Sequence, residues 1–433
     1  MSEGTDRAAT DRVPTVRALT RRYALLAGLR WLPIGLCAPV IVLLQGARGL
    51  DLATTGRLLA LYGVVTVLLE LPTGGLADVV GRRVVLVLAS VLTAAFLLVM
   101  AVAGDPAWFA VAMVLGAVGR ALGSGPLEAW YVDAVHDVEP GLSVRGGLSA
   151  AQSAEAMMLG VGAIAGGGLP GVAAGLWPGL QSSGGAPLVT LSIPLIGAAA
   201  LALAHAAAVA LLVREAARTR VGAFEVVRDV PRTVRDGIRI AVGDDVLRRL
   251  TLRSLLLGLA LGGMELLSPG TFAGLLGGAE QGSGAFGLLV ALGFGATAAG
   301  AAYAPRIAGR LGGGARAAGL ISWLGVPAAA IVAGPSAVAA GLGYITVYLM
   351  VGTVGPLTSE LLHGRVEADR RSTIVSVESL ALQLGGVGAS LGLGALATAA
   401  SPTAGFLVIA AALGVSGCVL IGRTNGRASL PSG

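Results

Sequence analysis

The chain has 433 residues, of which 55% are hydrophobic and 12% are charged, and its formal net charge is +6. A soluble protein carries about 25% charged residues, so this composition excludes a soluble enzyme and indicates a membrane protein. The positive net charge does not predict nucleic-acid binding, because in a membrane protein the position of the charges matters more than their sum. The two cysteines, Cys37 and Cys418, lie in apolar runs, and their spacing fits neither a disulfide framework nor a metal site.

Apolar stretches recur along the whole chain. A helix needs about 20 residues to cross the roughly 30 Å of hydrocarbon in a bilayer. The twelve stretches of this length cover residues 24–46, 54–77, 84–103, 107–130, 148–173, 188–213, 250–273, 284–305, 317–334, 337–361, 372–398 and 403–422. Glycine is abundant, with 68 residues, and favours close approach between such helices. We therefore predict an all-α membrane protein with twelve transmembrane helices.

The arginines predict the orientation of the chain in the membrane. Alternate connections hold nearly all of them, whereas the remaining connections hold only Arg48 and Arg57. Basic residues accumulate on the cytoplasmic side of membrane proteins. We therefore expect a multi-pass protein of the cell membrane whose tails, residues 1–23 and 423–433, are both cytoplasmic.

The longest polar segment, residues 214–249, divides the chain into two bundles of six helices, residues 24–213 and 250–422. Apolar residues at near-helical spacing alternate with arginines in this segment, which predicts an amphipathic linker helix on the cytoplasmic leaflet. A regulatory or partner-binding role is the alternative. Gly125-Pro126-Leu127 recurs 230 residues later as Gly355-Pro356-Leu357, and Gly81-Arg82 recurs 228 residues later as Gly309-Arg310. These two echoes predict a duplicated six-helix unit with pseudo-two-fold symmetry.

A dense group of glycine and charged residues, Gly74-Gly75-Leu76-Ala77-Asp78-Val79-Val80-Gly81-Arg82-Arg83, lies between the second and third stretches. It resembles the loop signature of major facilitator superfamily transporters, although Val79 departs from the usual basic residue. The resemblance covers nearly the whole chain and implies a fold of two six-helix bundles. It also implies a conformational latch at the cytoplasmic gate, formed by Gly74, Asp78, Gly81, Arg82, Arg83 and Asp133, with Asp133 as an ion-pair partner of Arg82 or Arg83. The alternative is a charge group that only sets topology.

Charged residues inside the apolar stretches are candidates for proton coupling, because a charge there is costly and functional by default. Arg120 resembles the arginine of the fourth helix that is linked to proton coupling in antiporters of the family. Glu265 is the deepest carboxyl group of the second bundle, and Glu128 and Glu155 are further candidates. The alternatives are a structural ion pair for Arg120, a place at the outer rim for Glu265, and pairing with cytoplasmic arginines for Glu155.

Substrate-binding residues follow from the same resemblance. Arg30, Arg120, Glu265, Tyr344 and Tyr348 fall on the helices that line the central cavity in this fold. The low charge of the chain favours a hydrophobic substrate, cationic or zwitterionic in character. The glycine-rich run of residues 162–171 in the fifth stretch resembles the antiporter signature of drug exporters.

The resemblance implies a secondary active transporter that exports a hydrophobic drug, antibiotic or secondary metabolite by proton-coupled alternating access. An importer or uniporter of a nutrient or metabolite would share the fold and is the alternative. The sequence shows no arrangement of a nucleophile and a base that would indicate an enzyme. We expect no cofactor, no metal and no nucleic-acid partner, and a monomer that binds its small-molecule substrate, protons and membrane lipids.

Overall fold

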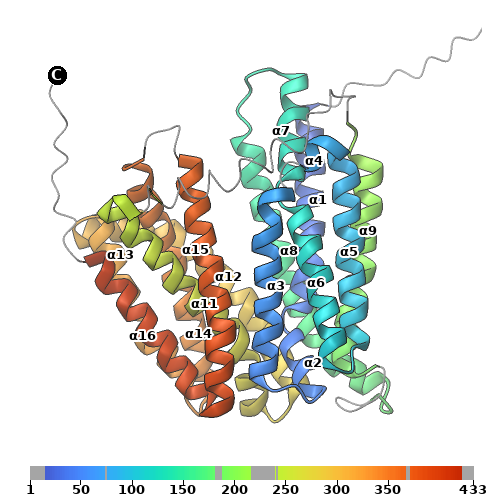
Figure 1. Ribbon diagram of the computed structural model, residues 1–433, viewed down its shortest axis with the longest axis vertical. Coiled ribbons are helices and arrows are strands. Elements are labelled where there is room, and N and C mark those ends of the chain that lie inside the picture. The colour runs from blue at the N-terminus through green and yellow to red at the C-terminus, as the bar shows by residue number, and fades with distance from the viewer. Residues whose placement is uncertain are drawn as a thin grey trace, which may run out of the picture.

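The structure, a computed structural model, describes residues 15–73, 76–180, 188–215, 239, 242–366 and 371–421, except for the side chains of 71–73, 78 and 371–373. All regular secondary structure in these residues is helical (Figure 1). The elements are α1 (Val16–Cys37), α2 (Ile41–Ala47), α3 (Leu52–Thr73), α4 (Leu76–Val80), α5 (Arg82–Val102), α6 (Pro106–Gly123), α7 (Pro126–Val138), α8 (Arg145–Leu176), the short 3-10 helix η1 (Thr190–Ser192), α9 (Ile193–Leu212), α11 (Asp245–Leu276), α12 (Ala279–Leu311), α13 (Gly314–Val332), α14 (Ala337–His363), α15 (Arg371–Ala399) and α16 (Pro402–Ile421).

The prediction of twelve membrane-spanning helices is confirmed. In the described residues, twelve helical segments are long and apolar enough to cross a bilayer. Two of them are interrupted, since α1 with α2 forms the first and α6 with α7 forms the fourth. The protein is therefore a multi-pass membrane protein of the all-α class.

Several helices begin earlier than the apolar stretches predicted. Helix α1 begins at Val16 instead of residue 24, and α11 begins at Asp245 instead of residue 250. Both starts are capped, because the Thr15 side chain accepts from a backbone N–H and Asp244 accepts from two. Hydropathy detects only the part of a helix that lies in hydrocarbon, whereas backbone hydrogen bonding continues into the polar residues beyond it.

Parts of the predicted polar segments lie outside the described residues. These are residues 1–14 of the N-terminal tail, residues 216–238, 240 and 241 of the linker with its predicted amphipathic helix, and residues 423–433 of the C-terminal tail. The start of α1 at Val16 takes the last residues of the predicted tail into the first helix.

The fourth predicted span, residues 107–130, is two helices. Helix α6 ends at Gly123, and α7 begins at Pro126 and continues to Val138. Gly125 between them has φ of +90°, a left-handed conformation that L side chains rarely adopt. The sequence echo at Pro356 is different, because α14 continues through that proline.

The helices form two groups, which we call the N-half (α1–α9) and the C-half (α11–α16). Within the N-half, α1 packs against α8 and α9, and α5 packs against α6 and α9. Within the C-half, α11 packs against α15 and α16, and α14 packs against α12 and α13. We call the end of the molecule where α9 stops and α11 starts the linker end, and the other end the opposite end. The two halves diverge toward the linker end (Figure 1).

The two halves meet mainly through two helix pairs, α3 with α15 and α8 with α12, and α2 adds smaller contacts with α11 and α12. Both of the main contacts depend on glycine. A Cβ atom on Gly56 of α3 would collide with the Ser390 carbonyl, and one on Gly167 of α8 would collide with the Ser283 carbonyl. The Ser283 hydroxyl donates to the Gly167 carbonyl at 3.0 Å. These contacts lie toward the opposite end, where they hold the halves together backbone to backbone.

Apolar packing differs between the halves. The N-half core consists mainly of two separate clusters, one around Met100 and Phe109 near the opposite end, the other around Tyr23 and Tyr131 near the linker end. The C-half has one continuous cluster that extends from Leu247 to Leu420. The interruption of the N-half core lies at the middle of its helices, and it is there that polar side chains gather.

Candidate functional site

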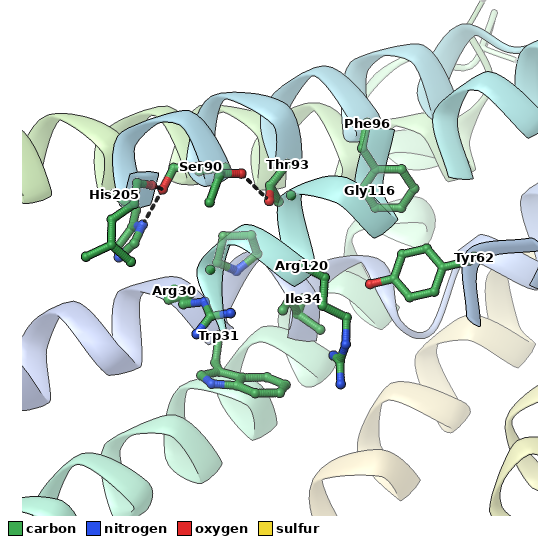
Figure 2. A pocket seen from close by; sticks show the side chains of 16 residues that line it. Arg30, Trp31, Ile34, Tyr62, Ser90, Thr93, Phe96, Gly116, Arg120 and His205 are labelled. Carbon is green, nitrogen blue, oxygen red and sulfur yellow. Dashed lines mark hydrogen bonds between the residues drawn. The ribbon is translucent and has the colours of Figure 1, made fainter. Parts of the chain in front are cut away.

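A cavity lies inside the N-half between its two main apolar clusters (Figure 2). Its volume is about 70 Å³. Helices α1, α3, α5, α6 and α9 supply its walls. This cavity, which we call the N-half cavity, is lined by Arg30, Trp31, Pro33, Ile34, Tyr62, Leu86, Ala89, Ser90, Thr93, Phe96, Gly116, Gly119, Arg120, Gly123, Ala202 and His205.

The space of the N-half cavity depends on one glycine face of α6. Gly116, Gly119 and Gly123 lie three and four residues apart, which places them on the same side of the helix. A Cβ atom at Gly116 would lie 2.9 Å from the Phe96 ring. A Cβ atom at Gly123 would lie 2.8 Å from the Arg30 guanidinium. Larger residues at these glycine positions would therefore displace both Phe96 and Arg30 from the wall of the cavity.

His205 closes one side of the cavity and is 3% exposed. Its Nδ1 atom lies 2.8 Å from Ser90 Oγ, and the Ser90 hydroxyl donates to the Leu86 carbonyl at 2.8 Å. The Ser90 hydroxyl and Nδ1 of His205 therefore share a hydrogen bond whose donor is set by the tautomer of His205. The other ring nitrogen, Nε2, is buried and makes no hydrogen bond within the described part of the chain.

Arg30 and Arg120 both line the N-half cavity and lie within electrostatic range of each other (Figure 2). Neither is among the ion pairs, with N···O within 4.0 Å, that the described residues form. Two carboxyl groups lie further off. Glu155 of α8 is within electrostatic range of Arg30, and Glu265 of α11 is within range of Arg120. The structure therefore brings four of the predicted residues into one electrostatic group.

Glu265, Tyr344 and Tyr348 belong to the C-half. Glu265 is exposed, and so is Arg120 in the N-half, although each lies near the middle of its membrane-spanning segment. The rings of Tyr344 and Tyr348 stack with centroids 4.7 Å apart. Tyr344 is only 2% exposed and packs edge-on against Phe286 at 5.7 Å. The structure thus places Tyr344 in the apolar core of the C-half, whereas its predicted role in substrate binding remains a prediction.

The predicted latch residues lie at the linker end. Arg82 at the start of α5 forms an ion pair with Asp133 of α7. Gly81 has φ of +104° and separates α4 from α5. Gly74 and the side chain of Asp78 lie outside the described residues. The Arg82–Asp133 pair joins two helices of the same half, so it braces the N-half.

Glu215 is a residue that sequence reasoning missed in this region. Its carboxylate accepts from the Arg83 backbone N–H at 3.1 Å, at the N-terminus of α5. A carboxylate is favoured there by the unpaired N–H groups of the first turn. Its neighbour Arg214 accepts from the Trp130 indole through its carbonyl at 3.1 Å. The sequence around Glu215 does not identify it as a cap of α5. Glu215 follows α9, and a capping residue from another part of the chain has no fixed sequence distance from the helix that it caps.

Glu70 was also missed, and it joins the two halves. Its Oε1 atom accepts from the Ser124 hydroxyl of the N-half at 3.1 Å, and its Oε2 atom accepts from the Gln383 amide of the C-half at 3.1 Å. A carboxyl group inside an apolar run was the available signal. Glu128, a predicted proton-coupling residue, is exposed in the first turn of α7, where the helix dipole favours a negative charge.

Metal ligation has no geometric support in the described residues. No group of three or more His, Cys, Asp or Glu side chains there is placed to hold a metal ion.

Comparison with known proteins agrees with this architecture. A sequence model of the Major Facilitator Superfamily matches residues 23–389. No curated protein matches the chain. The fold is similar to crystal structures of three transporters, each at low sequence identity. They are the nucleoside transporter NupG (12% identity, 93% of this chain and 98% of that chain, TM-score 0.73), a bacterial homologue of the human lysosomal transporter Spinster in an inward-facing and occupied conformation (15% identity, 94% and 95%, TM-score 0.72) and the peptide transporter POT in complex with sulfate (15% identity, 93% and 93%, TM-score 0.67).

Proposed function

Since the chain belongs to the Major Facilitator Superfamily and is a transporter, not an enzyme, we propose that it exports a hydrophobic small molecule in exchange for protons by alternating access. One observation carries this proposal. Arg120 of the N-half and Glu265 of the C-half, both exposed in the middle of the membrane-spanning region, lie within electrostatic range of each other. A charge pair that connects two mobile halves is an element whose strength a proton can change.

Protonation of Glu265 is the switch in this mechanism. When Glu265 is ionised, Arg120 attracts it and draws the two halves together at this level. When Glu265 is protonated, the attraction is lost and the halves are free to change their relative tilt. Glu155 beside Arg30 and Glu128 at the start of α7 are further proton acceptors in the N-half. Protons that bind in the outward-open state and are released in the inward-open state would drive the substrate out of the cell.

The linker end is the cytoplasmic end in this proposal. Arginines accumulate there, whereas Arg48 and Arg57 stand alone at the opposite end of the described chain. Both tails and the linker then face the cytoplasm of a cell membrane. The divergence of the halves toward the linker end corresponds to an inward-open state, and the glycine contacts near the opposite end to a closed outer gate (Figure 1).

The loop around Gly81 acts as a latch in the other half of the cycle. In the inward-open state, Arg82 is held by Asp133 and the α5 N-terminus by Glu215, all within the N-half. In the outward-open state, Asp78 and Arg83 would contact the C-half and hold the linker ends together. The latch residues therefore exchange partners during transport.

Reconstituted proteoliposomes with an internal pH-sensitive dye test the coupling. Addition of a compound that the protein carries should discharge an imposed pH gradient in the wild type. Glu265→Gln should abolish this proton movement while leaving counterflow of the compound intact. Glu360→Gln, an exposed carboxyl at the linker end, is the matched control and should behave as wild type. Proton movement that persists in Glu265→Gln would contradict the assignment and move it to Glu155 or Glu128.

The direction of transport needs a second measurement. Cells with the protein should accumulate less of the compound than cells without it, and an uncoupler should remove the difference. Higher accumulation in cells with the protein would establish an importer, and accumulation that ignores the proton gradient would establish a uniporter.

A further inference from the structure

The N-half cavity has an unbalanced charge. Two guanidinium groups, those of Arg30 and Arg120, form part of its wall, and no carboxyl group lines it. Glu155 and Glu265 are within electrostatic range, but neither forms an ion pair with these arginines in the described structure. Two like charges beside one cavity repel each other. An anion between them would replace this repulsion by two attractions.

Most other polar groups of the cavity are already paired, although Nε2 of His205 is buried without a hydrogen-bond partner in the described residues. The Ser90 hydroxyl donates to Leu86, and the Thr93 hydroxyl donates to Ala89. The hydroxyl of Tyr62 is directed toward the Arg120 side chain and remains able to donate to a ligand (Figure 2). The available donors of the cavity therefore include two guanidinium groups and one phenol, which form a set suited to a small oxyanion.

Size limits what the cavity can hold. A volume of about 70 Å³ exceeds the ~10–15 Å³ that one water needs but is far below the ~300–1,000 Å³ of a site for a drug-sized molecule. The cavity can take one acidic group and not a whole substrate. Arg120 is exposed and lies within electrostatic range of Glu265 in the C-half. Trp31, Ile34 and Phe96 supply an apolar wall for the atoms attached to that group.

We infer that the N-half cavity binds the acidic group, a carboxylate or a similar oxyanion, of the molecule that the protein transports. This inference rests on the proposed transport function and names the class of its substrate. It replaces the cationic or zwitterionic substrate expected from composition by an amphipathic organic acid. Arg30 and Arg120 bind the acid, Tyr62 donates to it, and the rest of the molecule extends between the halves.

Trp31 offers a local test, because its indole forms part of the cavity wall. The chain has five tryptophans, so the signal of Trp31 is the difference in fluorescence between wild type and Trp31→Phe. Iodide is the anionic probe and acrylamide the neutral one. In the wild type, iodide should quench Trp31 strongly. In Arg30→Gln/Arg120→Gln, iodide quenching should fall on the order of tenfold because the local anion concentration falls, while acrylamide quenching should stay unchanged.

Two controls separate charge from structure. Arg57→Gln removes an exposed arginine near the opposite end of α3 and should leave iodide quenching of Trp31 at the wild-type value. Arg30→Lys/Arg120→Lys keeps both charges and should retain most of the iodide quenching. Iodide quenching that is equal in the wild type and in Arg30→Gln/Arg120→Gln would overturn the inference.

Competition identifies the kind of anion. Benzoate should displace iodide at lower concentration than acetate does, and benzamide should not displace it. Equal potency of acetate and benzoate would overturn the assignment to an organic acid with an apolar body, and equal potency of benzamide and benzoate would overturn the role of charge.

These measurements use purified protein without a gradient, so they are independent of proton coupling. Normal proton movement together with absent iodide binding would refute the acid site alone. Intact iodide binding together with proton movement that survives in Glu265→Gln would refute the coupling mechanism alone.

Discussion

The N-half and the C-half are built from the same number of membrane spans, but they use the middle of the membrane differently. In the N-half, α6 presents Gly116 and Gly119, and the space that they leave is lined by charged and polar side chains. In the C-half, the counterpart helix α14 presents Tyr344 and Tyr348, and a continuous apolar core fills the same level. Gly293 accommodates these rings, since a Cβ there would lie 3.2 Å from Tyr348.

This difference shows how a duplicated unit can divide two tasks. A polar cavity weakens the packing of the half that contains it, because two clusters replace one core. The filled C-half forms the more continuous body and contributes one exposed acid, Glu265, at the boundary. Under the functions proposed above, the N-half would recognise the substrate and the C-half would respond to the proton.

The largest contrast concerns arginines in the two halves. Arg253 of the C-half is 6% exposed and lies within electrostatic range of Glu378. Loss of the partner of a buried polar group costs about 1–3 kcal/mol, so Arg253→Gln should lower the melting temperature of the purified protein. Arg120→Gln should abolish transport and change stability by less than about 0.5 kcal/mol, because Arg120 is exposed.

Differential scanning fluorimetry and transport assays on both variants check this contrast. A destabilised Arg120→Gln protein would make Arg120 a structural charge and would remove the distinction between the halves.

The contact between the halves gives the next contrast. Gly167 and Gly168 are adjacent in α8 but differ in their surroundings. A Cβ atom added at Gly167 would collide with the Ser283 carbonyl, whereas a Cβ atom added at Gly168 would have no neighbour within 4 Å. Gly167→Ala should destabilise the protein by about 1–3 kcal/mol and alter distances between spin labels on the linker ends of α8 and α12. Gly168→Ala should leave the distances unchanged and should not destabilise the protein, because alanine there gains only helix propensity, about 1 kcal/mol. Equal distance distributions in the two variants would show that this contact does not determine the tilt of the halves.

The repeated Gly-Pro-Leu element gives a smaller contrast with opposite signs. Gly125 adopts a positive φ, so Gly125→Ala should cost about 1–2 kcal/mol. Gly355 lies within the continuous helix α14 with no atom within 4 Å of an added Cβ, so Gly355→Ala should stabilise by about 1 kcal/mol through helix propensity. Thermal unfolding of the two single variants measures both. A loss of stability in each would indicate that the two copies have the same conformation.

The smallest effect concerns helix caps at the opposite end. Asp51 precedes α3, and hydrogen bonds from the Thr54 side chain and backbone N–H lower its pKa. The pKa of Asp51 is therefore lower in the folded protein than in the unfolded protein, so its ionised carboxylate stabilises the fold. This stabilisation is fully present above the pKa of the unfolded state and is lost as the pH falls through the pKa of the folded state. Ser336 caps α14 without titrating. Asp51→Ser should therefore remove a slight acid sensitivity in thermal melts between pH 3 and pH 5, the range of ordinary Asp values.

The fold followed from the sequence to a large extent. Twelve apolar stretches define the spans because the hydrocarbon thickness sets their length, and the structure confirms all twelve. The loop at Gly81 was also within reach, since a loop motif is a local feature, and Asp133 followed from its expected place at the same end of the bundle as Arg82. Helix starts such as Val16 were not, because capping by Thr15 extends a helix past its apolar part.

The individual residues of the candidate site could be predicted from the sequence, but the cavity that they form could not. Intramembrane charge singled out Arg30, Arg120 and Glu265, yet it could not show that the two arginines share a cavity inside one half. The place of His205 in the cavity wall was also out of reach, because its hydrogen bond to Ser90 depends on α5 and α9 lying side by side. Glu70 and Glu215 act through partners distant in sequence, a relation that spacing cannot encode.

The glycine contacts between the halves form a pivot that lies nearer to one end of α8 than to the other. At 1.5 Å per residue, α8 extends about 33 Å from Gly167 to its linker end, so a rotation of about 10° moves that end by about 6 Å. The shorter part of α8 beyond Gly167 moves far less. In the alternating-access cycle proposed above, a small rotation at the opposite end would therefore become a wide opening at the linker end, and its amplitude would depend on how closely the two glycine backbones touch.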